Sequence, residues 1–136
     1  MIVFIDSNIP MYVAGADHPH RAPAQRFLSR VSSGAIKACT STEVLQEILY
    51  RYSALKRLDL AAEVYNLFVR ICPVVFDVTL ADTDRARDIL LDTDGISARD
   101  AVHAAVMANH DLRWIASFDT GFDRIPGLRR YGLEED

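Results

Sequence analysis

Four acidic residues on separate segments of the chain have positions in which together they could hold a metal ion. Asp6 follows the apolar run 2–5, and Asp119 follows a second short apolar run. Glu47 and Asp100 lie near the starts of segments with helical periodicity. Carboxylates that lie close together repel one another unless a cation stands between them. Because no Cys/His zinc pattern is present, such a cluster favours a hard cation, Mg²⁺ or Mn²⁺.

Three of these acids also have a structural interpretation. Asp6 and Asp100 could stabilise the N-terminus of a helix, and Asp119 stands before Thr-Gly, where an aspartate favours a turn. Taken singly, each acid is therefore weak support for a site. Taken together, they are acids that a parallel α/β fold could bring to one end of its sheet.

The second acid has to be chosen between Glu43 and Glu47. The segment 40–43 matches a capping box, which gives Glu43 a sufficient structural role. Glu47 lies one turn later beside apolar residues, where an unpaired carboxylate is costly. Pairing with Arg51 four residues on is the structural alternative for Glu47, but we favour Glu47 as the functional acid.

Other residues of reactive types receive structural interpretations. His103 lies one turn after Asp100, and a packed, hydrogen-bonded histidine is favoured over a metal ligand or general base. Cys39 and Cys72 are expected to be buried free thiols. A further set of acids is predicted to lie on the solvent-exposed face of a helix and in the loop that follows it: Asp82, Asp84, Asp88, Asp92 and Asp94.

Strand-like and helix-like segments alternate along the 136 residues, a length that suits one domain. Strands are expected at 2–5, 35–40, 74–78 and 113–117, with a weaker one at 129–131. Helices are expected at 7–14, 24–33, 40–57, 60–71, 79–91 and 97–109. This alternation predicts an α/β domain with a mainly parallel sheet covered on both faces.

Composition excludes some classes of protein. A formal charge of −4 argues against non-specific coating of nucleic acid, but not against an enzyme that contacts it locally. No apolar run approaches the ~20 residues of a membrane span, and the N-terminus lacks the basic start of a signal peptide. We therefore expect a cytoplasmic protein with no membrane partner.

The ordered set of motifs resembles the PIN-domain ribonucleases, most closely the VapC toxins of type II toxin–antitoxin systems, over essentially the whole chain. The segments that carry the resemblance are Ile2–Asn8, Val44–Leu49, Ser97–Ala105, Ser117–Asp119 and the following 121–128. The resemblance implies a three-layer α/β/α sandwich in a single domain, 1–136. It also implies metal-dependent hydrolysis of RNA phosphodiester bonds.

The resemblance assigns roles to individual residues. It implies a catalytic quartet of acids, Asp6, Glu47, Asp100 and Asp119. Asn8 and Ser117 are the implied polar companions of this quartet. Asp123 is an additional acid that is not always required. Asp6, Asp100 and Asp119 are the implied ligands of Mg²⁺, with Mn²⁺ as a substitute. Apart from the resemblance, Arg51 and Arg99 are local basic groups that are candidate contacts to the RNA backbone, with ordinary surface charge as the structural alternative.

The resemblance also implies partners, namely an RNA substrate, a cognate antitoxin protein and a second copy of the chain in a homodimer. Two alternatives remain. A haloacid-dehalogenase-type phosphatase also has a catalytic aspartate after its first strand, but it requires a second aspartate two residues later, where this chain has Asn8. A catalytically inactive PIN-like module that binds RNA or protein predicts the loss of quartet acids, whereas all four are present.

Overall fold

The computed structural model describes residues 1–133 and contains one parallel sheet. Its strands are β1 (Ile2–Ile5), β2 (Lys37–Ser41), β3 (Val75–Phe76), β4 (Trp114–Ala116) and β5 (Arg129–Arg130), in the order β3-β2-β1-β4-β5. The predicted parallel sheet is confirmed, including its weak fifth strand. Since β1 is central, the residue that follows it lies at the middle of the sheet's carboxyl edge.

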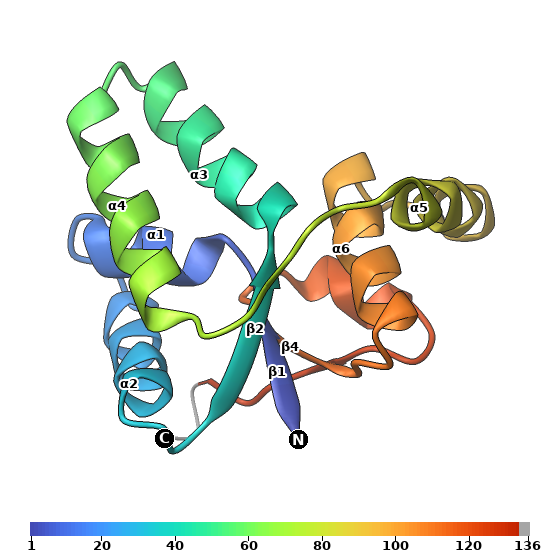
Figure 1. Ribbon diagram of the computed structural model, residues 1–136, viewed down its shortest axis with the longest axis horizontal. Helices are drawn as coiled ribbons and strands as arrows, with labels where there is room; N and C mark the ends of the chain where they lie inside the picture. Colours follow the sequence, from blue (N-terminus) through green and yellow to red (C-terminus); the bar gives the residue numbers. More distant parts are fainter. Residues whose placement is uncertain (134–136) are drawn as a thin grey trace.

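Helices cover both faces of the sheet, which confirms the predicted three-layer sandwich. The helices are α1 (Asn8–Ala14), α2 (Arg21–Ser32), α3 (Thr42–Ala54), α4 (Leu58–Ile71), α5 (Leu80–Asp92) and α6 (Ala98–Asn109), with a 3₁₀ turn η1 (Thr120–Arg124). In Figure 1, α1–α4 lie on one side of the strands and α5 and α6 on the other. No helix within residues 1–133 is long and apolar enough to cross a membrane.

The core explains why β1 forms where it does. Val3, Phe4 and Ile5 are all fully buried, as expected for a central parallel strand with helices on both faces.

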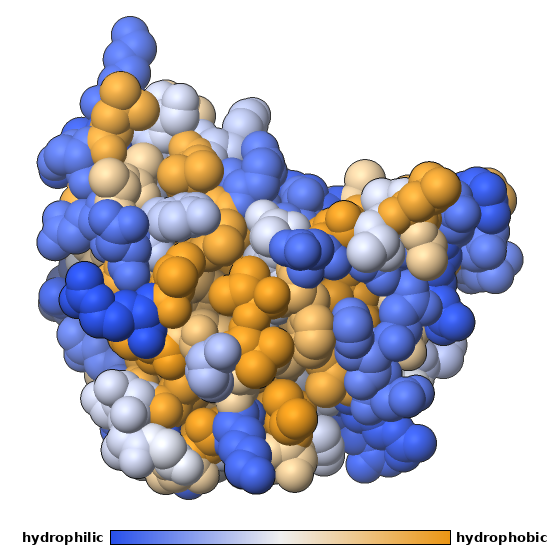
Figure 2. Space-filling view, viewed as in Figure 1, coloured by the Kyte–Doolittle hydropathy of each residue, from blue (hydrophilic) through white to orange (hydrophobic). Residues whose placement is uncertain are grey.

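Helices do not cover the whole sheet. Figure 2 shows apolar side chains gathered over β1 and β2, and a cavity of about 600 Å³ there is lined by apolar residues such as Ile36 and Phe76 together with polar ones such as Lys37 and His110. Cys39 and Cys72 are free and buried, as predicted.

Alanines let α6 approach its neighbours closely. Ala101, Ala104 and Ala105 are at most 1% exposed, and the helix packs against α5. The methyl side chains allow a short distance between backbones, which places the N-terminus of α6 beside the end of β1. Ser97 caps this helix, since its Oγ accepts a hydrogen bond from the Asp100 backbone N–H at 3.1 Å.

Several element starts differ from the predictions by a few residues, and two of these differences have a clear cause. Helix α2 begins at Arg21 rather than at residue 24, with Pro23 in its first turn, where proline costs no hydrogen bond. Helix α3 begins at Thr42, because Thr40 still belongs to β2 and its Oγ donates to the Ile5 carbonyl at 2.9 Å.

Two predicted side-chain roles were also wrong. Thr40 cannot cap α3, and no side-chain cap is present there, so the cap assigned to Glu43 was wrong. Asp82 is not solvated. It is 2% exposed, forms a capping box with Thr79 and accepts a hydrogen bond from Asn109 at 2.7 Å.

Candidate active site

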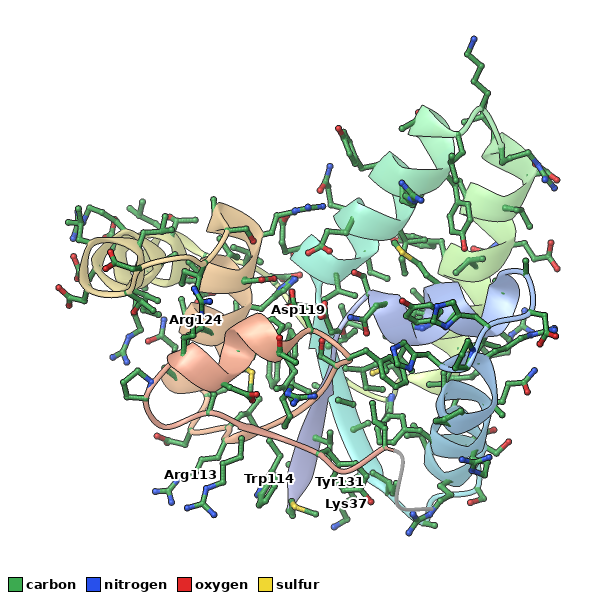
Figure 3. The ribbon with its side chains drawn as sticks, turned by 180° about the vertical axis from the view of Figure 1, so that it is seen from behind. Lys37, Arg113, Trp114, Asp119, Arg124 and Tyr131 are labelled. Carbon is green, nitrogen blue, oxygen red and sulfur yellow. The ribbon has the colours of Figure 1, made fainter. Side chains whose placement is uncertain are left out.

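The predicted quartet converges at the carboxyl end of the sheet. A pocket of about 390 Å³ there is lined by Asp6, Ser7, Asn8, Glu47, Gly95, Ser97, Arg99, Asp100, Asp119 and Gly121. In Figure 3, Asp119 lies at this end, whereas Lys37, Arg113 and Trp114 lie at the amino end of the strands. All four acids of the quartet therefore face one pocket.

Asp6 is the best-supported carboxylate of the site. It is 5% exposed, and its Oδ2 accepts hydrogen bonds from Ser117 Oγ at 2.7 Å and Asn8 Nδ2 at 3.4 Å. Its Oδ1 accepts the backbone N–H of Ser7 at 2.7 Å. Asn8 also donates to Ser117 Oγ at 3.1 Å, so the two predicted polar companions orient Asp6 jointly.

Glu47 is held from α6 and from the end of β1. His103 Nε2 pairs with Glu47 Oε1, and Ser7 Oγ donates to Glu47 Oε2 at 2.7 Å. Burial pushes the pKa of Glu47 up, but the bonds from His103 and Ser7 outweigh it and leave the pKa below its usual value. Glu47 therefore keeps its negative charge although it is only 8% exposed.

Asp100 and Asp119 form the open side of the site. Asp119 Oδ1 accepts the Gly121 backbone N–H at 2.8 Å, so it makes the predicted turn. A Cβ on Gly121 would lie 3.0 Å from Asp119 Oδ1 and 3.9 Å from Asp100 Oδ2. The glycine thus leaves room beside both carboxylates, which a larger side chain would fill.

The electrostatics of the site are compatible with a bound cation. Burial raises the pKa of Asp6, and burial with the charges of Asp6 and Asp119 raises the pKa of Asp100 to about 7. The three carboxylates repel one another, and a shared proton or a bound cation would relieve that repulsion. Their oxygen atoms are the donors that Mg²⁺ and Mn²⁺ prefer, so these residues fit the predicted ion.

His103 is a packed, hydrogen-bonded histidine, as the sequence favoured, and its partner is an acid of the predicted quartet. It is fully buried, its Nε2 is 3.7 Å from Asp6 Oδ1, and it pairs with Glu47. Within residues 1–133, Asp6, Glu47 and His103 form a group whose potential ligand atoms lie within 4.8 Å of one another. Because the Nε2 of His103 is engaged by Glu47, we assign it a positioning role.

Two further residues near the site were missed or set aside. Ser7 is the N-cap residue of α1, but its hydroxyl makes no cap hydrogen bond and donates to Glu47 instead. Glu43 is half-buried, and burial raises its pKa, partly offset by His103. The contact of Ser7 joins residues 40 positions apart, and no local pattern could have indicated it.

The remaining predicted residues lie in different places. Arg99 lines the pocket. Arg51 is exposed on α3, one turn beyond Glu47, and is not among the lining residues. Asp123 makes a two-point ion pair with Arg130, at 2.9 and 3.1 Å, and is also outside the pocket lining.

Comparison with known proteins agrees with this geometry. Residues 3–128 match the family described as PIN domain. The chain is 45% identical to ribonuclease VapC13 of Mycobacterium tuberculosis over 95% of this chain and 98% of the relative. It is 33% identical to ribonuclease VapC23 of the same organism, over 87% and 93% of the two chains.

Solved structures share the fold. The toxin VapC20 of Mycobacterium tuberculosis, described as cleaving the sarcin–ricin loop, matches with a TM-score of 0.72 and 24% identity, over 90% of this chain and 93% of that chain. The VapBC2 complex of Rickettsia felis, bound to a promoter DNA fragment, matches with a TM-score of 0.76 and 18% identity, over 96% and 98%. With its motifs, parallel sheet and acidic pocket, this chain belongs to the PIN domain family, among the VapC-type proteins.

Proposed function

We propose that this chain is a ribonuclease that hydrolyses RNA phosphodiester bonds with Mg²⁺, for which Mn²⁺ can substitute. The observation that carries the proposal is the cluster of Asp6, Asp100 and Asp119 around one pocket, with a pKa of Asp100 near 7. The named activity of the VapC relatives supports the same reaction. In this proposal the three aspartates hold the ion.

The chain's own residues orient the reaction. When bound, the ion lowers the pKa of a water molecule and neutralises charge on the phosphate. Ser117 and Asn8 fix the direction of Asp6. Glu47 stays ionised and lines the pocket, so its negative charge adds to the attraction of the pocket for a cation. Arg99, also at the pocket, pairs with a phosphate of the RNA backbone.

We further propose that the protein is the toxin of a toxin–antitoxin pair, acts in the cytoplasm and forms a homodimer. The structural relatives include toxin–antitoxin complexes. Exposed apolar residues on α3, α4 and the turn between them offer surface to a protein partner: Leu49, Tyr50, Leu55, Leu58, Leu67 and Val69. Exposed apolar surface of this kind is typical of protein–protein contacts.

The test of the activity removes single charges from the cluster. Asp6→Asn and Asp100→Asn keep the shape of the side chain, and each is expected to lower RNA cleavage at least about 100-fold, as loss of a metal contact does. The control is Asp59→Asn, an exposed acid paired with Arg57 at the surface. Cleavage of total RNA with Mg²⁺, with Mn²⁺ and with EDTA is the measurement.

The inactive-module alternative makes a different prediction for the same variants. Calorimetric titration with Mn²⁺ should detect binding by the wild type and much weaker binding by Asp6→Asn. A wild type that binds no metal, or an Asp6→Asn protein that cleaves RNA at the wild-type rate, would overturn the proposed mechanism. Mapping the 5′ ends of cellular RNA after induced expression then identifies the target.

A further inference from the structure

Four aromatic rings form a connected cluster at the rim of the acidic pocket. The aromatic cluster consists of Tyr12 on α1, His18 and His20 in the loop before α2, and Phe118 after β4. The rings of His20 and Phe118 stack at 4.0 Å with an interplanar angle of 12°. Tyr12 meets Phe118 edge-on at 5.4 Å. His18 completes the cluster, 4.7 Å from Tyr12 and 4.9 Å from His20.

The aromatic cluster is joined directly to the site. Phe118 stands between Ser117, which binds Asp6, and Asp119, which lines the pocket. The Phe118 backbone N–H donates to Asn8 Oδ1 at 3.4 Å, and Asn8 also lines the pocket. Tyr12 lies one turn after Asn8 on α1, and therefore on the same face of that helix.

The cluster is fixed at its inner side and open at its outer side. Tyr12 and Phe118 pack against the hydrophobic core, yet both remain partly exposed, as does His20, and His18 is exposed. Rings held in this way form a rigid surface that loses little freedom when a ligand stacks on it. This arrangement differs from Tyr131 and Phe27, an aromatic pair on another part of the molecule, of which Phe27 is fully buried.

We propose that the aromatic cluster binds a nucleobase of the RNA next to the phosphate that is cleaved, an inference that rests on the proposed ribonuclease activity. Single-stranded RNA is recognised largely by stacking of unpaired bases on aromatic rings. The chain carries a net charge of −4, so general attraction to phosphates contributes little. Stacking does not depend on that charge, and the aromatic cluster adjoins the pocket through the contact of Phe118 with Asn8.

The experiment uses single-turnover cleavage by the full chain with Mg²⁺. A cleavage site is first mapped with a pool of random single-stranded RNA, and one oligonucleotide with that site is then made with an abasic ribose at either position flanking the cut. At one position we expect the abasic sugar to lower kcat/KM about 5- to 150-fold, the effect of losing one stacked base.

The variants assign this penalty to the aromatic cluster. Tyr12→Leu and His20→Leu keep an apolar side chain without the ring. They should cleave intact RNA more slowly and show little further loss with the abasic RNA. Tyr131→Leu disrupts the other ring pair, whose centroids are 5.5 Å apart, and should retain the full abasic penalty.

Each contrary outcome has a distinct meaning. The inference is overturned if the wild type shows no abasic penalty, an outcome that does not depend on the folding of any variant. It is also overturned if the abasic penalty is equal in the wild type and in the leucine variants. Leucine variants that cleave both RNAs like the wild type but bind the antitoxin weakly would make the cluster a protein-docking surface. A wild type that cleaves no RNA at all overturns the proposed function itself, and this inference with it.

Discussion

At the scale of single residues, the orientation of Asp6 depends on small polar groups rather than on other charges. Ser117 is 1% exposed, and its hydroxyl donates to Asp6 Oδ2 while it accepts from Asn8 and from the Asp119 backbone. A buried hydroxyl with this many partners has a fixed direction. It therefore fixes the direction of the carboxylate that it binds.

Ser117→Ala is expected to lower Mn²⁺ affinity, or cleavage at limiting Mg²⁺, about 10- to 100-fold, because a support of a metal ligand is lost. Ser33→Ala is the matched control, since the Ser33 hydroxyl donates to the Arg30 carbonyl at 3.1 Å on the surface. Calorimetric titration measures the affinity. Wild-type affinity in Ser117→Ala would mean that other contacts suffice to orient Asp6.

The pKa of Asp100 predicts how stability depends on pH without metal. Its value of about 7 lies above the ordinary 3.8, so between about pH 4 and 7 the folded state binds more protons than the unfolded state. The free energy of unfolding should therefore fall as the pH rises through this window. Asp100→Asn removes this titration and should flatten the decline.

Urea unfolding in EDTA across that window measures the effect, with Asp59→Asn as control because Asp59 is an exposed acid. Added Mn²⁺ should raise the stability of the wild type most at the upper end of the window, where Asp100 is ionised. Equal pH slopes for the wild type and Asp100→Asn would contradict the prediction. The raised pKa of Asp6 leaves some slope in the variant.

At the scale of elements, α6 supplies two residues of the site from one end of its length. Asp100 lies in its first turn and His103 one turn later, so both face the end of β1. The serine cap at Ser97 and the row of buried alanines fix the position and the rotation of the helix. A shift of α6 would separate Asp100 from Asp6 and His103 from Glu47.

Ala105→Leu is expected to destabilise the protein by about 1–3 kcal/mol, because a larger side chain must force α6 away from its neighbours. Ala105 is fully buried. Ala54→Leu, at an exposed position at the end of α3, is the control and should change stability little. Urea unfolding measures both. A stable Ala105→Leu protein would show that the space beside α6 can adapt.

At the scale of the whole molecule, the topology determines where the acids meet. The sheet order puts β1 between β2 and β4, so the segments that follow these strands lie beside one another. The apolar side chains over β1 and β2 in Figure 2 and the exposed leucines of α3 and α4 remain on the surface. Surfaces of this kind favour association.

The proposed homodimer predicts a mass in solution of twice the 15.2 kDa of the chain. Sedimentation velocity over a range of concentrations measures it, with and without the antitoxin. The antitoxin should convert the dimer into a larger particle. A chain that stays monomeric at all concentrations would exclude the homodimer.

Much of the fold could be predicted from local pattern. Three features depend only on residues that are close in the sequence: the apolar run before Asp6, the helical spacing around Glu47 and the serine at the start of α6. Apolar residues repeat at short intervals in such segments, so the element can be predicted from the spacing. The same local reasoning failed at Glu43. Thr40 continues β2 by donating to the Ile5 carbonyl, and a contact between distant residues cannot be read from spacing.

The sequence by itself determined the α/β class, and the resemblance pointed to four acids that the structure brings to one pocket. Only the tertiary structure decided which groups hold Glu47, because Ser7 and His103 meet it across 40 and 56 residues of chain. It also decided that Asp123 pairs with Arg130. Side-chain partners depend on how helices and strands pack in space, and the packing of α6 against β1 is a property of the whole fold.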